Sequence, residues 1–185
     1  MTFDSDKFQH GLMSEYLAIL EPLQHKPIRL LEIGIFKGGS LHFWSQYFKH
    51  PETTIVGLDI EPPTAKFGDN VTVYRCDQND SAALRKIADQ HGPFDLIIDD
   101  GAHFQRETEN CFRVLFDLMR PGGYYVIEDW DAGYWKNQPA YAGMVELITG
   151  IIQNVPDLKI EAFKILLAAG KAMAFFRRGV QGWSS

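Results

Sequence analysis

The chain has 185 residues, a net charge of -6 and a pI near 5.5. Its lysines and arginines are scattered along the sequence, which argues against a nucleic-acid partner, because that would need basic residues gathered on one face. The length suits one domain with one sizeable core, and a hydrophobic share of 45% is typical of a globular protein. We therefore expect a single domain over residues 1–185, with a short helical segment in residues 1–25 and the core in residues 28–178.

The N-terminus and the cysteines bear on the compartment. The first residues carry acids where a secretory signal would carry bases, and the chain has no uninterrupted apolar stretch of about 18 residues. Cys76 and Cys111 show neither a metal-binding spacing nor a disulfide framework, so both are expected to be small core residues. These features predict a cytoplasmic protein without a membrane partner.

Helical and strand-like segments alternate from the N-terminus. Apolar residues at helical spacing predict an amphipathic helix from Phe8 to Leu20, which stops before Pro22. The five predicted strands that follow are residues 28–33, 53–60, 71–77, 94–100 and 124–130. Predicted helices follow three of them, at residues 40–50, 81–92 and 106–121, with Ser40 as the N-cap of the first.

The C-terminal segment has a different pattern. Residues 159–178 contain two strand-like runs separated only by a tight turn with a glycine, which indicates an antiparallel hairpin at one edge of the sheet. The β/α alternation before it predicts a mainly parallel sheet that is covered on both faces. The expected fold is therefore α/β, a Rossmann-like, doubly wound sheet of seven strands with a C-terminal antiparallel hairpin.

Acidic side chains stand at the ends of the predicted strands. The segments "LIIDDGAH" (96–103) and "YYVIEDWD" (124–131) both run from apolar residues straight into acid pairs. The full set is Glu32, Asp59, Asp77, Asp99, Asp100, Glu128 and Asp129. Ligands of open α/β sheets bind beyond the carboxyl ends of the strands, so one mouth would collect these groups. Each charge near a core costs several kcal/mol unless it is compensated, and we hypothesise that a bound cation supplies the compensation.

The turn after the first strand distinguishes between ligand classes. A dinucleotide site requires G-x-G-x-x-G, whereas this chain reads Glu32-Ile-Gly34-Ile-Phe-Lys-Gly38 and lacks the third glycine of that pattern. The glycines permit close backbone approach to a ligand. The Glu32 carboxylate before them is a poor neighbour for a phosphate and a good one for an ammonium group.

This arrangement resembles motif I of the class I S-adenosylmethionine-dependent methyltransferases, whose seven-stranded sheet also ends in an antiparallel hairpin. The resemblance implies an acid at the ribose hydroxyls, here Asp59, and a polar pair near the adenine, here Asp77 and Gln78. Asp99 adjoins this group and is also expected to cap a backbone turn. The predicted cofactor-binding residues are Glu32, Gly34, Gly38, Asp59, Ile60, Asp77, Gln78 and Asp99.

The two acid-pair segments look like those of the metal-dependent sugar and macrolide O-methyltransferases and of the related cephalosporin-hydroxylase-like group. That resemblance implies Mg²⁺ as a second cofactor and His103 as the general base, with a small hydroxylated substrate such as a sugar or natural-product intermediate. The implied metal ligands are Asp100, Glu128 and Asp129. Physical reasoning agrees, because neighbouring strands end about 5 Å apart and carboxylates that close repel one another unless a hard cation or protons intervene.

The segment after the last acid pair is rich in aromatic residues: Trp130, Tyr134, Trp135 and Tyr141. They could be ordinary core residues or the wall of a substrate pocket. Asp131 could be an extra ligand or a helix cap. Sugar-modifying relatives of this group often carry a further N-terminal domain, so the acceptor pocket is expected to come from loops or from a second copy in a homo-oligomer.

Other classes of function remain open at this stage. A dinucleotide-dependent oxidoreductase would fit the alternation but not the turn at Glu32, and a metal-dependent hydrolase would leave Glu32, Asp59 and Asp77 without roles. A nonenzymatic S-adenosylmethionine-binding protein would use Glu32 and Asp59 but have no functional metal cluster. Asp100, Glu128 and Asp129 could be solvated loop acids or could surround the sulfonium without a metal. His103 would then be an ordinary surface or capping histidine.

Overall fold

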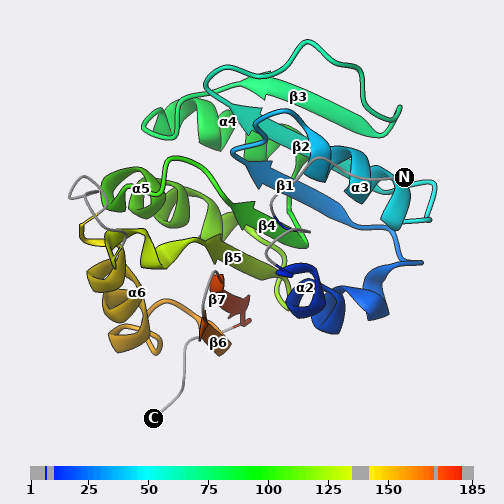
Figure 1. Cartoon of the computed structure of the whole chain (residues 1–185). Coiled ribbons are helices and arrows are strands. Elements are labelled where there is room, and N and C mark those ends of the chain that lie inside the picture. The colour runs from blue at the N-terminus through cyan, green and yellow to red at the C-terminus, as the bar shows by residue number, and fades with distance from the viewer. Residues whose placement is uncertain (1–6, 8–10, 135–141, 169–170, 181–185) are drawn as a thin grey trace.

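The computed structural model describes residues 7, 11–134, 142–168 and 171–180, and its centre is a seven-stranded sheet (Figure 1). The strands are β1 (Arg29–Ile33), β2 (Thr54–Asp59), β3 (Val71–Arg75), β4 (Leu96–Asp99), β5 (Tyr124–Glu128), β6 (Ile160–Ala168) and β7 (Lys171–Arg178). Their spatial order is β3-β2-β1-β4-β5-β7-β6. The predicted α/β sheet of seven strands is thus confirmed.

Strand direction changes only near one edge of the sheet. β1 to β5 pair in parallel, whereas β7 pairs antiparallel with both β5 and β6. This confirms the predicted C-terminal hairpin, although residues 169 and 170 of its turn lie outside the described residues. The chain order runs outward from β1 to β3 on one side and from β4 to β5 on the other. The switch point, where ligands of such sheets bind, therefore lies between β1 and β4.

Helices cover both faces of the sheet (Figure 1). The α-helices are α2 (Met13–Leu20), α3 (Gly39–Tyr47), α4 (Ser81–His91), α5 (Gln105–Leu115) and α6 (Met144–Gln153). Short 3₁₀ turns are η1 (Glu21–Leu23), η2 (Phe116–Leu118) and η3 (Trp130–Tyr134). Helices α4, α5 and α6 pack on one face and α2 and α3 on the other. Strand residues alternate between the two cores, as Leu30 and Leu31 do on β1.

Two local predictions differ from the structure, and one helix was not predicted. α3 begins at Gly39 with Gly38 as its N-cap, so the prediction that Ser40 caps this helix is wrong. The Ser40 hydroxyl instead donates to the buried Glu32 carboxylate at 2.8 Å, a stronger partner than a backbone amide. α2 begins at Met13, and residues 8–10 of the predicted helix lie outside the described residues. α6 was not predicted, although Met144, Leu147, Ile148 and Ile151 have helical spacing and are buried.

Several buried residues match the sequence-based expectation. Cys76 and Cys111 are both buried, as expected of small core residues. Trp130 is also in the core, whereas Tyr134 is 63% exposed, and Trp135 and Tyr141 lie outside the described residues. Among the helices that the structure describes, none is long and apolar enough to cross a membrane.

Candidate active site

The site forms at the switch point, beyond the carboxyl ends of the paired strands β1 and β4. Ile33 of β1 is in register with Asp99 of β4, and Asp99 is in register with Ile127 of β5. The acid pairs Asp99–Asp100 and Glu128–Asp129, each of which spans the end of its strand, therefore lie at the same edge of the sheet. This juxtaposition of the two segments is what parallel neighbouring strands require.

Gly34 allows the turn after β1 to touch the loop after β4. Its φ is +82°, and a Cβ added there would lie 2.0 Å from the backbone oxygen of Asp100. A real Cβ does not approach a backbone oxygen so closely, so only glycine fits. The predicted need for close approach at this turn thus has a structural cause.

The variant Gly34→Ala is expected to lose at least about 2 kcal/mol of stability, from left-handed backbone strain and the clash with the Asp100 carbonyl. Gly150→Ala is the matched control, since a Cβ at Gly150 of α6 meets nothing within 4 Å. Alanine is the better helix former, so the control should gain about 0.5–1 kcal/mol. Urea unfolding monitored by circular dichroism measures both values. Equal stability of Gly34→Ala and wild type would contradict the close approach.

A cavity of about 670 Å³ opens at these strand ends. Its volume is in the range of small-molecule sites. Of the predicted site residues, its wall contains Gly34, Asp59, Ile60, Asp77, Gln78, Asp100 and His103. Phe36 and Ile60 are also exposed on it, at 75% and 59%. Two exposed apolar side chains at a polar cavity suit a ligand with a flat apolar part.

Asp59 fixes the glycine turn from the end of β2. Its Oδ2 accepts the backbone amides of Ile35 and Phe36, each at 3.0 Å, and its Oδ1 accepts the amide of Glu61 at 2.9 Å. Oδ2 already accepts two hydrogen bonds, whereas Oδ1 has a further lone pair that can accept a hydroxyl from the cavity. Asp59 therefore both shapes the turn and offers an acceptor to a ligand.

Gln78, which lines the cavity, forms a hydrogen-bond network with the buried Asp99. Gln78 Nε2 donates to Asp99 Oδ1 at 3.1 Å, and Gln78 Oε1 accepts the amide of Ala102 at 2.8 Å. The Tyr125 hydroxyl donates to Asp99 Oδ2 at 2.9 Å. Burial raises the pKa of Asp99 to about 7, against the lowering effect of its hydrogen bonds to Tyr125, Gly101 and Gln78. Asp99 is therefore placed to hold the loop after β4. Asp77 accepts the amide of Asn79 at 2.8 Å and lines the cavity.

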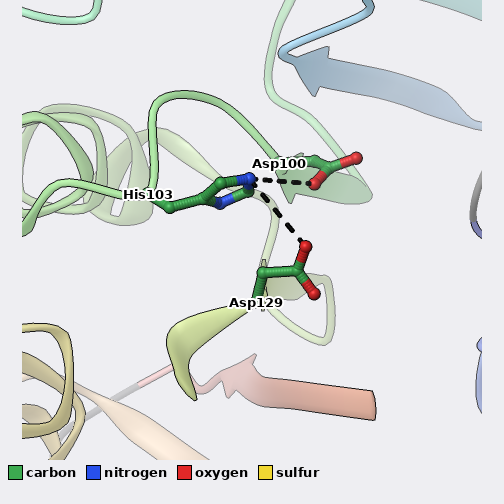
Figure 2. Close-up of side chains that lie close together, drawn as sticks. All are labelled: Asp100, His103 and Asp129. Carbon is green, nitrogen blue, oxygen red and sulfur yellow. Dashed lines mark ion pairs between the residues drawn. The ribbon is translucent and has the colours of Figure 1, made fainter. Parts of the chain in front are cut away.

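Asp100, His103 and Asp129 converge beyond the ends of β4 and β5, a place called the mouth below, and Figure 2 shows their side chains pointing toward one another. Of the three, Asp100 and His103 line the cavity. His103 Nε2 lies 3.9 Å from Asp100 Oδ1 and 3.9 Å from Asp129 Oδ2. Both His103 and Asp129 have positive φ, at +55° and +50°. Non-glycine residues in this region cost about 1–3 kcal/mol each, and such strain concentrates at functional sites.

Lys7 is a site residue that the sequence analysis did not identify. It is 1% exposed and lines the cavity, and its Nζ lies 2.9 Å from Glu128 Oε1 and 3.4 Å from Glu32 Oε1. The same ammonium forms a hydrogen-bonded ion pair with Asp100 Oδ2. These three carboxylates hold the pKa of Lys7 well above its usual value despite the opposing effect of burial. Part of the compensation expected from a bound cation thus comes from the chain itself.

Glu32 and Glu128 lie on the face of the sheet that α2 and α3 cover. The Tyr16 hydroxyl of α2 donates to Glu128 Oε1 at 2.5 Å, and Ser40 of α3 donates to Glu32 Oε2 at 2.8 Å. The Glu32 and Glu128 side chains are 0% and 2% exposed. The structure thus brings two of the three predicted metal ligands together with His103 and places Glu128 against Lys7 and Tyr16. Burial raises the pKa of Glu32, while Lys7 and Ser40 lower it.

The donor set at the mouth suits a hard divalent cation. Asp100, His103 and Asp129 each offer one atom, and these atoms lie within 4.8 Å of one another. Mg²⁺ in proteins is commonly held by one or two carboxylates with water in the remaining positions. Asp100 and Asp129 would supply the two carboxylates. The Asp100 and Asp129 side chains are 13% and 21% exposed, so solvent reaches them.

The fold and the site define the chain as an α/β cofactor-binding domain of the switch-point class. Residues 31–130 match the family described as "Methyltransferase domain". The chain belongs to this methyltransferase family.

Curated relatives and a solved structure extend the comparison. The chain is 41% identical over 128 residues to an 8-demethyl-8-(2-methoxy-alpha-L-rhamnosyl)-tetracenomycin-C 3'-O-methyltransferase of Streptomyces olivaceus, covering 65% of this chain and 32% of that protein. It is 37% identical over 160 residues to the demethylmacrocin O-methyltransferase of Streptomyces fradiae, covering 80% and 40%. The MycE methyltransferase, solved with Mg, SAH and mycinamycin VI, matches with a TM-score of 0.73 and 31% identity over 90% of this chain and 49% of that one. The chain therefore spans less than half of each of these proteins.

Proposed function

We propose that this chain is the catalytic domain of an S-adenosylmethionine-dependent O-methyltransferase that uses a divalent cation, taken as Mg²⁺. Its acceptor is a hydroxyl of a small, sugar-bearing molecule, as the names of the relatives suggest. The observation that carries the proposal is a cavity of about 670 Å³ at the switch point, whose wall contains Asp59, the glycine turn, Asp100 and His103.

The cofactor would lie across the switch point. In this placement Asp59 accepts a ribose hydroxyl, Asp77 and Gln78 lie toward the adenine, and the exposed side chains of Phe36 and Ile60 cover its flat face. The methionine part would then reach the turn at Gly34, next to Asp100. Glu32 would support this turn through Ser40 and Lys7.

His103 would act as the general base of the reaction. Its Nε2 faces Asp100 and Asp129, whose carboxylates would hold the cation and also stabilise a protonated imidazole. When bound, the cation would lower the pKa of an acceptor hydroxyl, and the sulfonium cofactor would offer its methyl group. His103 takes the proton of that hydroxyl as its oxygen bonds the methyl carbon, and the electrons of the breaking carbon–sulfur bond stay with sulfur. The strained backbone at His103 and Asp129 would hold both groups in place before the acceptor binds.

Methyl transfer to sugar-bearing polyketides tests this proposal. The chain is incubated with S-adenosylmethionine and a panel of such acceptors, in Mg²⁺ or in EDTA, and mass spectrometry detects the gain of one methyl group. We expect product in Mg²⁺ and little or none in EDTA. Equal transfer in EDTA would exclude the cation from catalysis, and a panel without any methylated product would contradict the assigned acceptor class.

A further inference from the structure

The buried ion cluster around Lys7 lies directly behind the proposed cation site. Its carboxylates come from the ends of three adjacent strands, with Glu32 on β1, Asp100 after β4 and Glu128 on β5. Lys7 Nζ contacts all three, and the Lys7 and Glu32 side chains are 2% and 0% exposed. Three acids thus share one ammonium group in a region that solvent hardly reaches.

The two oxygens of Asp100 face two different cation positions. Its Oδ2 pairs with Lys7, whereas its Oδ1 points toward His103 Nε2 at 3.9 Å. Asp129 lies on the His103 side, and Glu128 lies on the Lys7 side. The lysine therefore also fixes the rotation of the Asp100 carboxylate, because one oxygen is held inward and the other is presented at the mouth.

The inner side of Asp100, where Lys7 lies, carries more negative than positive charge. On the inner side, one ammonium faces Glu32, Glu128 and one oxygen of Asp100. Carboxylates this close repel one another, so removing that ammonium would leave a strongly attractive position for another cation. Oxygen ligands in this number suit a hard divalent ion.

We propose that Lys7 is a positioning residue that serves as the resident cation of this acid cluster. Its ammonium fills the position between Glu32, Asp100 and Glu128 that a divalent ion would otherwise take, so the chain holds one divalent ion, at Asp100 and Asp129. This inference rests on the proposed function, which places a divalent ion beside His103.

Mn²⁺ binding tests the inference without turnover. The number of Mn²⁺ ions bound per chain is measured from the electron paramagnetic resonance of free Mn²⁺ for wild type, Lys7→Met and Lys164→Met. Lys164 is the matched control, because it also loses one positive charge near the N-terminal helix, where its ammonium pairs with Glu15. We expect one more ion per chain in Lys7→Met than in wild type or the control. No additional ion in Lys7→Met would overturn the proposal.

A second pair of variants tests the inference even if Lys7→Met does not fold. With Lys7 in place, Asp129→Asn should weaken Mn²⁺ binding by at least about tenfold, as expected when a ligand is lost. Glu128→Gln should leave the affinity close to that of wild type. If Glu128→Gln weakens Mn²⁺ binding as much as Asp129→Asn, the ion lies on the Lys7 side and the inference is wrong. Failure of wild type to bind S-adenosylhomocysteine would instead count against the proposed function.

Discussion

The variant Lys7→Met is expected to lose about 3–5 kcal/mol of unfolding free energy at neutral pH in EDTA. Removing one partner of a buried ion pair has a cost of this size, because the opposite charge remains buried without compensation. Here three carboxylates lose the same ammonium, while Tyr16 and Ser40 still donate to Glu128 and Glu32. Urea unfolding in EDTA measures the loss.

Lys164→Met is again the control, since its exposed pair with Glu15 should contribute no more than about 1 kcal/mol. If Lys7→Met is as stable as this control, Lys7 does not compensate the acids. Saturating Mn²⁺ should restore a larger part of the lost stability in Lys7→Met than in the control, because an ion that binds only the folded chain stabilises it.

The loss in Lys7→Met should depend on pH. Burial raises the pKa of Glu32 and the ion pair with Lys7 lowers it, so removal of Lys7 raises this pKa further. A carboxyl group whose pKa is higher in the folded chain than in the unfolded chain favours folding at low pH, and this contribution disappears as the pH rises through the folded pKa. The deficit relative to wild type should therefore be smaller in mild acid than at neutral pH, where the Lys7 ammonium of the wild type is fully charged. A deficit that shrinks from mild acid to neutral pH would contradict the assignment.

His103→Ala should lower turnover by about 100- to 10,000-fold, the range for loss of a general base. The assay uses the acceptor that the methyl-transfer panel identifies. Cofactor affinity should change little, because the proposed cofactor contacts are Asp59, Asp77 and the turn at Gly34, whereas His103 Nε2 faces Asp100 and Asp129. Steady-state kinetics gives the turnover, and calorimetry with S-adenosylhomocysteine gives the affinity.

A matched variant distinguishes loss of the general base from structural damage around His103. His103→Gln keeps a polar side chain of similar size but cannot take a proton, so its turnover should fall as far as that of His103→Ala. If His103→Gln retains most of the wild-type turnover, or if both variants lose cofactor affinity in proportion to turnover, the base role is wrong.

The alternation of strand residues predicted the sheet well because it is a local property. Leu31 and Ile33 alternate with Leu30 and Glu32 along β1, and each set enters a different core. The same alternation also carried an unused signal. Glu32 shares its face with Leu30, and Glu128 shares its face with Val126, so both point toward the face that α2 and α3 cover. The alternation of successive strand residues would thus have predicted that Glu128 and Asp129 point to different faces of the sheet.

The partners of these acids were not predictable in the same way. Lys7 is separated from Asp100 by 93 positions and Tyr16 from Glu128 by 112, so only the tertiary fold brings them together. In the sequence, Lys7 is one of many scattered basic residues. Asp129 faces His103 where its φ of +50° turns the chain at the end of β5. Asparagine, aspartate and glycine adopt this conformation more readily than other residues, but no sequence pattern required it here.

The most direct test of the account is calorimetric titration of S-adenosylhomocysteine into the wild-type chain and into Asp59→Ala. Asp59 holds the glycine turn and offers an acceptor to the cavity, so the account predicts binding of one molecule per wild-type chain and an affinity at least about tenfold lower in the variant. Urea unfolding checks that Asp59→Ala remains folded. If wild type does not bind S-adenosylhomocysteine, or if the folded variant binds it equally well, the cavity at the switch point is not the cofactor site.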